Sequence, residues 1–340
     1  MKNYISVDTS TFIIDKGSVS FNDVLSMLHL PKATFDSSIL SAFMSSLDIQ
    51  FFQYHGIQFG VKSYNLKCNL IEAYQDYGDI ERPYFPELFN VKFAYLRVNI
   101  TGKGMKWCRS NFLDRDKECF DQFLLDCQDY YQQDYGWHFS RNDIALDFVN
   151  YTFSERDIID DIYFTYCRQY RQKIDEDLDL IDFVFCNRTG GCPGRGMSFQ
   201  SKYGDTERTL YIGSVNSDTM LRIYDKYLES CDQDHHFIPS YEPDSDQLFQ
   251  GLDNSDIHSW IRFEVQLRNK QSQLFLCTRS LSDPLSFANW VWGRFSPGPR
   301  ASDDKRNYKK LDLKEFPFWT DFFKKAVTVP ITVNNLLSSD

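Results

Sequence analysis

Apolar and polar residues alternate over short stretches in the first hundred residues, which is the pattern of half-buried β-strands. The pattern predicts strands at residues 4–14, 49–52, 56–61 and 91–100. We expect the last of these to end in a glycine-rich turn at residues 101–104. Apolar residues three and four positions apart predict helices near residues 22–30, 115–135 and 155–180.

Three further segments, residues 140–148, 220–226 and 260–267, are predicted strands with unusual polar faces. Strand alternation gives each segment one polar set: Arg141, Asp143 and Asp147; Arg222, Tyr224 and Lys226; and Arg262, Glu264 and Gln266. Any one segment alone fits an antiparallel sheet with a solvated face. All three together indicate a site.

The three polar faces contain the groups needed for phosphoryl transfer through a tyrosine. Carboxylates hold hard divalent cations through oxygen, and arginine and lysine suit phosphate oxygens. A phenol has a pKa of about 10, so it needs cationic neighbours to be a useful nucleophile near neutral pH. Tyr224 has two such neighbours in the sequence, Arg222 and Lys226. The alternative is that Tyr224 simply packs against a neighbouring strand.

The composition narrows the class of protein. The 340 residues are 42% hydrophobic and 25% charged, which is ordinary for a globular chain, and no apolar stretch reaches the length of a membrane span. The first residues lack the apolar run of a signal peptide. The nine scattered cysteines fit reduced thiols better than disulfides or a zinc site. We therefore expect a cytoplasmic protein that does not bind a membrane.

The net charge of −11 argues against nucleic acid on its own, but the charge is unevenly distributed. Residues 268–325 contain twelve Lys or Arg against six Asp or Glu, so this segment is +6 and the remainder is −17. Aromatic residues make up 16% of the chain, and a minority of them could stack on unpaired bases. The basic segment is therefore either a DNA-binding surface or an ordinary charged tail.

The motifs, in their order, resemble those of the replication initiation factor family. This family includes rolling-circle initiators of staphylococcal plasmids, relaxases of some integrative conjugative elements, and RstA-type replication proteins of filamentous Vibrio phages. The motifs that carry the resemblance are residues 7–12, 101–105, 141–148, 209–214, 217–218, 221–226, Glu229 and 261–267. The resemblance spans about residues 5–270.

The resemblance implies a role for each polar residue. Tyr224 would cut one DNA strand and keep its 5′ end as a phosphotyrosine, with Arg222 and Lys226 assisting. Asp143, Asp147 and Glu264 would hold Mg²⁺ or Mn²⁺. The cations expected to contact phosphate or DNA are Arg141, Arg262, Arg268, Arg300, Lys305, Arg306, Lys309 and Lys310. Residues 1–268 would form the catalytic nicking domain, and residues 269–340 a smaller basic region that recognises the origin.

Some positions depart from the family pattern. Val215 stands where many members have arginine, Asn142 replaces an apolar residue, and Gln266 stands where a second acid is common. These departures leave open the number of metal ligands. They also leave open two other functions, a conjugative relaxase with the same chemistry and a DNA-binding regulator without nicking activity.

Ending replication requires a second strand transfer. The second nucleophile would be Tyr224 of another copy in a homodimer, or Tyr211, with Tyr227 as a weaker candidate.

The resemblance also implies a set of partners in the cytoplasm of a bacterial host. They are double-stranded origin DNA, single-stranded DNA, a host helicase of the UvrD or PcrA type and a host DNA polymerase. For the fold we expect an α+β architecture, relaxase-like or rolling-circle-initiator-like, with a largely antiparallel central sheet and helices packed on one face.

Overall fold

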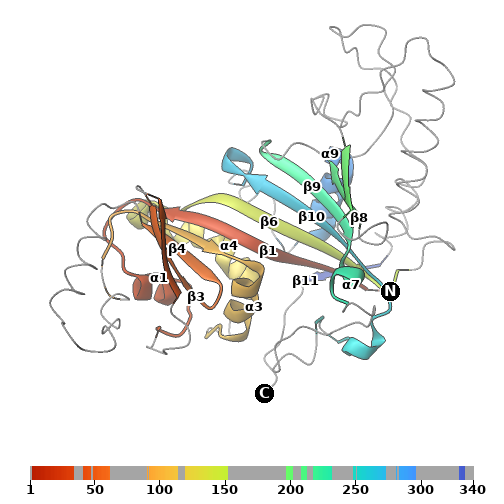
Figure 1. Cartoon of the computed structure of the whole chain (residues 1–340), viewed down its shortest axis with the longest axis horizontal. Coiled ribbons are helices and arrows are strands. Elements are labelled where there is room, and N and C mark those ends of the chain that lie inside the picture. The colour runs from red at the N-terminus through yellow and green to blue at the C-terminus, as the bar shows by residue number, and fades with distance from the viewer. Residues whose placement is uncertain are drawn as a thin grey trace, which may run out of the picture. The chain divides into compact units, whose positions relative to one another are not determined.

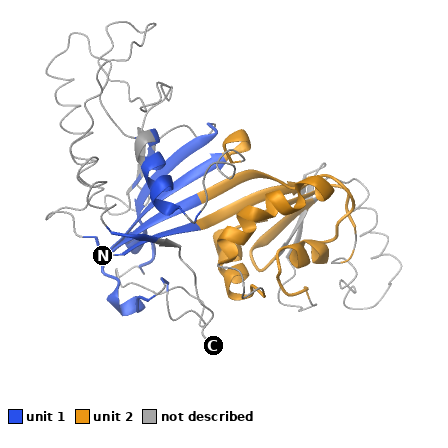
Figure 2. Ribbon diagram, turned by 180° about the vertical axis from the view of Figure 1, so that it is seen from behind, with its two compact units in different colours: residues 1–6, 144–267, 281–334 blue, residues 7–143, 268–280, 335–340 orange. Residues whose placement is uncertain are grey.

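The chain divides into two compact units, which Figure 2 shows in different colours. Unit 1 contains residues 1–6, 144–267 and 281–334, and unit 2 contains residues 7–143, 268–280 and 335–340. Both units include residues from either side of residue 268. The predicted division into residues 1–268 and 269–340 concerns function and does not coincide with these compact units. It stays a prediction.

The structure is a computed structural model. It describes residues 2–33, 41–46, 49–61, 90, 92–113, 119–151, 197–201, 208–212, 217–231, 248–249, 251–272, 281, 283–295 and 329–333. The helix predicted at residues 155–180 lies outside these ranges. In the described part of the chain, no helix is both long and apolar enough to cross a membrane.

Unit 2 is built on antiparallel strands in the order β2-β3-β4-β5-β1. They are β1 (Lys2–Ile14), β2 (Ser41–Ser46), β3 (Ile49–Tyr54), β4 (Ile57–Val61) and β5 (Leu96–Ile100). The predicted strands are thus confirmed, although β5 is shorter than residues 91–100 because Phe93 makes only an isolated bridge to Val19. β1 and β6 (His138–Val149) each have residues in both units.

Helices α1 (Phe21–Met27), α3 (Gly102–Ser110) and α4 (Phe120–Tyr135) cover one face of these strands (Figure 1). This confirms the helices predicted near residues 22–30 and 115–135. The same face of the sheet is apolar: Phe12 of β1 is fully buried and stacks on Trp137, with 3.8 Å between ring centroids. Since α4 buries residues three and four apart, its apolar side closes the core of unit 2.

Residues 101–104 begin helix α3 and do not form the predicted turn. Thr101 caps the helix, accepting from the Gly104 N–H at 3.3 Å and donating to the Gly56 carbonyl at 2.8 Å. A Cβ on Gly104 would lie 2.7 Å from the Gly56 carbonyl oxygen, a distance that Cβ atoms essentially never show. These glycines therefore let the β3–β4 hairpin dock closely on the start of α3.

A buried ion pair between Arg109 and Asp121 joins α3 and α4 to β1. The guanidinium donates to both carboxylate oxygens, at 2.7 and 2.8 Å, and to the Val7 carbonyl at 2.5 Å. The Val7 N–H in turn donates to Asp121 at 2.7 Å. The side chains are 10% and 1% exposed, so main-chain groups of β1 bind a pair that is almost fully buried.

Unit 1 contains strands in the order β6-β10-β9-β8-β7. Its elements are β7 (Met197–Ser201), β8 (Arg208–Ile212), β9 (Thr219–Asp225), α7 (Lys226–Glu229), η3 (Asn254–Asp256), β10 (Trp260–Arg268), α9 (Pro284–Phe295) and β11 (Ile331–Val333). β7, β8, β9 and β10 pair antiparallel, whereas β11 pairs parallel with residues 3–5 of β1. The predicted α+β fold with a largely antiparallel sheet is therefore confirmed.

One core cluster of unit 1 lies beside the strands that carry the polar motifs. Its buried members are Tyr4, Val149, Phe249, Ile257 and Trp260. Phe249 stacks on Tyr4 at 4.6 Å and meets Trp260 edge to face at 4.7 Å between ring centroids. The cluster therefore holds the first residue of β10 in a fixed apolar setting.

Candidate active site

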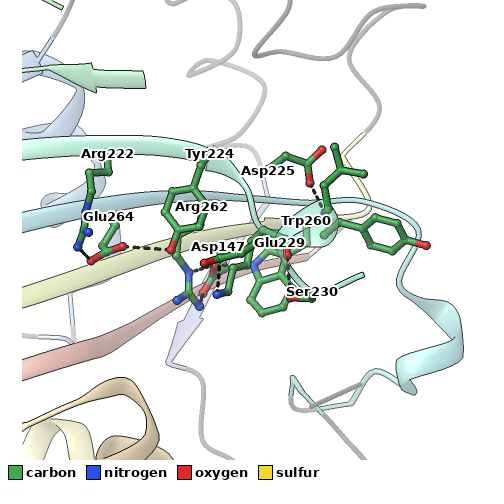
Figure 3. Close-up of polar contacts among 12 residues, drawn as sticks. Asp147, Arg222, Tyr224, Asp225, Glu229, Ser230, Trp260, Arg262 and Glu264 are labelled. Carbon is green, nitrogen blue, oxygen red and sulfur yellow. Dashed lines mark hydrogen bonds and ion pairs between the residues drawn. The ribbon is translucent and has the colours of Figure 1, made fainter. Parts of the chain in front are cut away.

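The antiparallel register of β9 and β10 brings two of the predicted polar sets together. Tyr224 lies opposite Arg262, and Arg222 lies opposite Glu264. Directly opposed residues of neighbouring strands project from the same face, so these four side chains share one side of the sheet. Figure 3 shows them gathered there with Asp147 of β6.

Glu264 connects the tyrosine to an arginine. The Tyr224 hydroxyl donates to Glu264 Oε2 at 3.1 Å, and Arg222 Nη2 forms an ion pair with Glu264 Oε1 (Figure 3). The Glu264 side chain is 3% exposed, whereas that of Arg222 is 27% exposed. The carboxylate is therefore buried and contacts both Tyr224 and Arg222, while the guanidinium still reaches solvent.

Asp147 is held by the two polar side chains of β10 nearest to it. Arg262 donates to both of its oxygens, from Nε at 2.7 Å and from Nη2 at 3.0 Å. The indole N–H of Trp260 donates to Asp147 Oδ1 at 2.6 Å. Asp147 is completely buried, so the polar face is covered here and is not the solvated sheet face that one strand alone suggested.

Lys226 is not on the strand face where alternation placed it, because β9 ends at Asp225. The Asp225 carboxylate accepts from the Leu228 N–H at 2.9 Å and caps the short helix α7, which begins at Lys226. Even so, the Lys226 ammonium lies 5.8 Å from the ring centroid of Tyr224 and forms an ion pair with Glu229 at 2.5 Å. Lys226 is therefore a neighbour of Tyr224 as predicted, but it is placed there by the start of helix α7 and not by the strand.

Arg141 and Asp143 pair with each other on β6, in the part of the strand that belongs to unit 2. Arg141 Nε donates to Asp143 Oδ1 at 2.9 Å, and its Nη2 pairs with the other oxygen. Asp143 is completely buried and Arg141 is 36% exposed. All three carboxylates predicted as metal ligands thus have an arginine partner.

Carboxylate oxygens are the donors that Mg²⁺ and Mn²⁺ prefer, and each carboxylate has more lone pairs than these hydrogen bonds use. The chemistry of the donors therefore suits a divalent cation. However, no group of three His, Cys, Asp or Glu side chains in the described ranges is arranged to hold a metal. The arginines occupy the carboxylates instead.

The candidates for a second nucleophile lie in different settings. Tyr211 of β8 is opposite Arg222 of β9, so it projects from the same face as the Tyr224 site. Tyr227 belongs to α7 and packs against the core cluster of Trp260.

Of the residues predicted to contact DNA in the C-terminal region, Arg268 is the last residue of β10. The others, Arg300, Lys305, Arg306, Lys309 and Lys310, lie outside the described residues, as does Val215.

Other nucleophilic side chains are less suited to react. Burial raises the pKa of Tyr4 and of Tyr151 to about 12, and that of the Cys119 thiol to about 11. Burial also raises the pKa of the free thiol of Cys108. Each of these groups is therefore held more firmly in its protonated form than in water.

Trp260 is a site residue that the sequence analysis missed. It contacts Asp147 through its N–H, and its ring lies 5.2 Å from the guanidinium carbon of Arg262 and 5.8 Å from the ammonium of Lys226. A signal was available, because strand alternation puts residue 260 on the same face as Arg262 and Glu264.

Comparisons with known proteins bear on the fold and on the family of this chain. The structure is similar to that of the rolling circle replication initiator protein from Geobacillus stearothermophilus, with a TM-score of 0.53 and 14% sequence identity over 98% of this chain and 100% of that chain. At this identity the likeness concerns the fold alone. A search of curated protein sequences gave no significant match. The model of a family described as replication initiation factor matches residues 137–336, which include β6, β9 and β10 with all the polar residues of the site. Because this match covers more than half of the chain, the protein belongs to the replication initiation factor family.

Proposed function

We propose that this protein initiates rolling-circle replication of a phage or plasmid by nicking and rejoining one DNA strand through Tyr224. One observation carries the proposal: the Tyr224 hydroxyl donates to a buried carboxylate, Glu264, whose other oxygen pairs with Arg222. A phenol in this setting has a proton acceptor on one side and a phosphate-binding cation close by. The family membership supports the role in replication.

The proposed reaction is a transesterification. As the phenol proton moves toward Glu264 Oε2, the Tyr224 oxygen attacks the phosphorus, and the bond from phosphorus to the 3′ oxygen breaks. The 5′ phosphate remains on Tyr224, and the 3′ oxygen takes up a proton and becomes the replication primer. Rejoining is the same exchange in reverse, so no external energy source is required.

Two cations beside Tyr224 are suited to meet the DNA phosphate. The side chains of Arg222 and Lys226 are 27% and 23% exposed, so both reach solvent near the tyrosine. They would balance the charge that develops on the phosphate oxygens. Arg262 is only 10% exposed and is engaged with Asp147, so we propose that it positions this carboxylate and does not itself contact the phosphate.

We include a divalent cation, Mg²⁺ or Mn²⁺, in the proposal, with Asp143, Asp147 and Glu264 as its ligands, each of which would have to exchange its arginine partner for the ion. When bound, such an ion would polarise the phosphodiester. The donor chemistry of these carboxylates supports this assignment.

The remaining partners follow from the same proposal. We propose that the basic region at residues 269–340, together with Arg268, binds the double-stranded origin, and that a host helicase and polymerase extend the 3′ end on single-stranded DNA. A homodimer would supply a second Tyr224 to end the reaction, or Tyr211 would act in the same chain. The site of action would be the cytoplasm of a bacterial host.

The proposal is tested by incubating the protein with Mn²⁺ and a supercoiled plasmid that carries the element's own origin. The wild type should produce a nicked circle with protein attached to the 5′ end, and Tyr224→Phe should produce neither. If the wild type binds the origin but never cuts it with any divalent metal, the protein is a DNA-binding regulator and the proposal is wrong.

A further inference from the structure

We propose that Trp260 is a positioning residue for the Tyr224 site: it orients the Asp147 carboxylate and holds the Lys226 ammonium beside the tyrosine. The inference rests on the proposed function, because it assigns Trp260 a part in that reaction. Trp260 itself has no group that could take up or release a proton near neutral pH, so it would act only through its contacts.

The first contact fixes a carboxylate. The indole N–H donates to Asp147 Oδ1 at 2.6 Å, and Arg262 binds the same carboxylate through two nitrogens. Asp147 is completely buried, so no water competes for these bonds. Three donors from β10 therefore define the direction of one carboxylate on β6, and a buried hydrogen bond to a charged group is among the stronger ones.

The second contact is made by the face of the ring. The Lys226 ammonium lies 5.8 Å from the Trp260 ring and equally 5.8 Å from the Tyr224 ring. Both distances are within the range in which a cation is attracted to an aromatic face. Lys226 thus lies close to the tyrosine and the tryptophan at once, while Glu229 binds its ammonium at 2.5 Å.

The core cluster of unit 1 holds Trp260 in place. Phe249 meets the indole edge to face at 4.7 Å, and Tyr227 packs against the same cluster. Trp260 is 5% exposed. Packing in the core cluster therefore fixes the orientation of the ring, and the ring in turn restricts where the Asp147 and Lys226 side chains lie.

Trp260→Phe tests the N–H contact, because it keeps an aromatic ring and removes the donor. Trp137→Phe is a matched control: Trp137 is fully buried, and its indole nitrogen makes no hydrogen bond. Both variants are compared on a single-stranded oligonucleotide with the nick site, with Mn²⁺, at a temperature where circular dichroism shows each to be folded. The single-turnover cleavage rate at saturating oligonucleotide and the dissociation constant are measured separately.

We expect Trp260→Phe to lower the cleavage rate about tenfold or more, with the dissociation constant within about twofold of wild type, and Trp137→Phe to change neither. In an Asp147→Asn background, Trp260→Phe should cost little further rate, since its partner carboxylate is already gone. A cleavage rate of Trp260→Phe equal to that of Trp137→Phe would overturn the inference. So would a full additional loss in the Asp147→Asn background.

A second measurement separates this inference from the proposed function. In protein labelled with ¹⁵N-tryptophan, the indole signal absent from Trp260→Phe belongs to Trp260. We expect Asp147→Asn to shift that signal and to leave the Trp137 signal in place. If the wild type does not cleave DNA, the proposed function fails while this shift still decides whether Trp260 holds Asp147; an unmoved signal contradicts the contact.

Discussion

Two of the arginine–carboxylate pairs have similar chemistry and different use: Arg109–Asp121 in unit 2 and Arg222–Glu264 in unit 1. In the first, main-chain groups of Val7 bind both partners, and the arginine is 10% exposed. In the second, the carboxylate also accepts from the Tyr224 hydroxyl, and the arginine is 27% exposed. The first pair joins three elements, whereas the second surrounds a reactive group.

The difference shows how a structural ion pair is distinguished from a candidate site. A pair that is almost fully buried and bound by the backbone is poorly placed to meet a ligand, and removing one partner leaves the other charge buried without a counter-charge. A pair that contacts a phenol and reaches solvent can exchange a partner for a phosphate. Disrupting the first pair should therefore lower the stability of the protein, whereas disrupting the second should lower the rate of DNA cleavage.

The largest expected effect is on stability, from Asp121→Asn. The change leaves Arg109 buried without its counter-charge, and we expect the free energy of unfolding to fall by about 3 kcal/mol or more. Chemical denaturation measures this. Asp134→Asn, an exposed position on the same helix, should stay within about 0.5 kcal/mol of wild type. A loss below about 1 kcal/mol for Asp121→Asn would contradict the structural role of the pair.

Glu264→Gln tests the second pair, Arg222–Glu264. It keeps the shape of the side chain but removes the charged acceptor from Tyr224, so we expect single-turnover cleavage to slow by about 100-fold or more. The control is Asp121→Asn at a temperature where it is folded, which should cleave at nearly the wild-type rate. Equal cleavage by Glu264→Gln and wild type would remove Glu264 from the mechanism.

Arginine-to-lysine changes sharpen the comparison. Lysine keeps the charge but loses the fork that binds two groups at once. At position 222 we expect cleavage to slow by about tenfold with stability retained, since the Arg222 side chain is 27% exposed and reaches solvent. At position 109 we expect about 1–2 kcal/mol lower stability and an unchanged cleavage rate, since three hydrogen bonds depend on the guanidinium. The reverse pattern would contradict the assignment.

The smallest effect concerns Asp23, whose carboxylate is 43% exposed and lies 3.7 Å from Lys92. Burial alone would raise its pKa, but hydrogen bonds from Ser20 and the charge of Lys92 lower it below its ordinary value of 3.8. The stability it adds is therefore present above about pH 4 and is lost as the pH falls through its folded pKa. Asp23→Asn should be about 0.5 kcal/mol less stable than wild type at pH 7, a difference that disappears in denaturation curves at acidic pH. A difference that stays constant as the pH falls below 3.8 and through the acid range would contradict this.

Much of the site follows from local pattern. The two-residue period of a strand is a local property, so the polar face with Arg222 and Tyr224 and that with Arg262 and Glu264 could be predicted from sequence. The pairing of particular arginines with particular acids could not. It depends on the register of β9 against β10, which long-range packing determines.

Two errors have the same physical origin. Lys226 was placed on a strand because the alternation continued to it, whereas the Asp225 carboxylate caps a helix that begins there. Residues 101–104 suggested a turn because they contain two glycines, whereas Thr101 caps α3 and Gly104 contacts Gly56, which lies far away in the sequence. In both places a side-chain cap outweighed the local pattern.

The central claim is that Tyr224 is the nucleophile of the Arg222–Glu264 site. The most direct measurement is to trap the covalent complex formed on a single-stranded oligonucleotide, digest it with protease and nuclease, and identify the modified peptide by mass spectrometry. The account predicts a nucleotide on Tyr224 and no adduct in Tyr224→Phe. An adduct on Tyr211 or Tyr227 in the wild type, with Tyr224 unmodified, would contradict it.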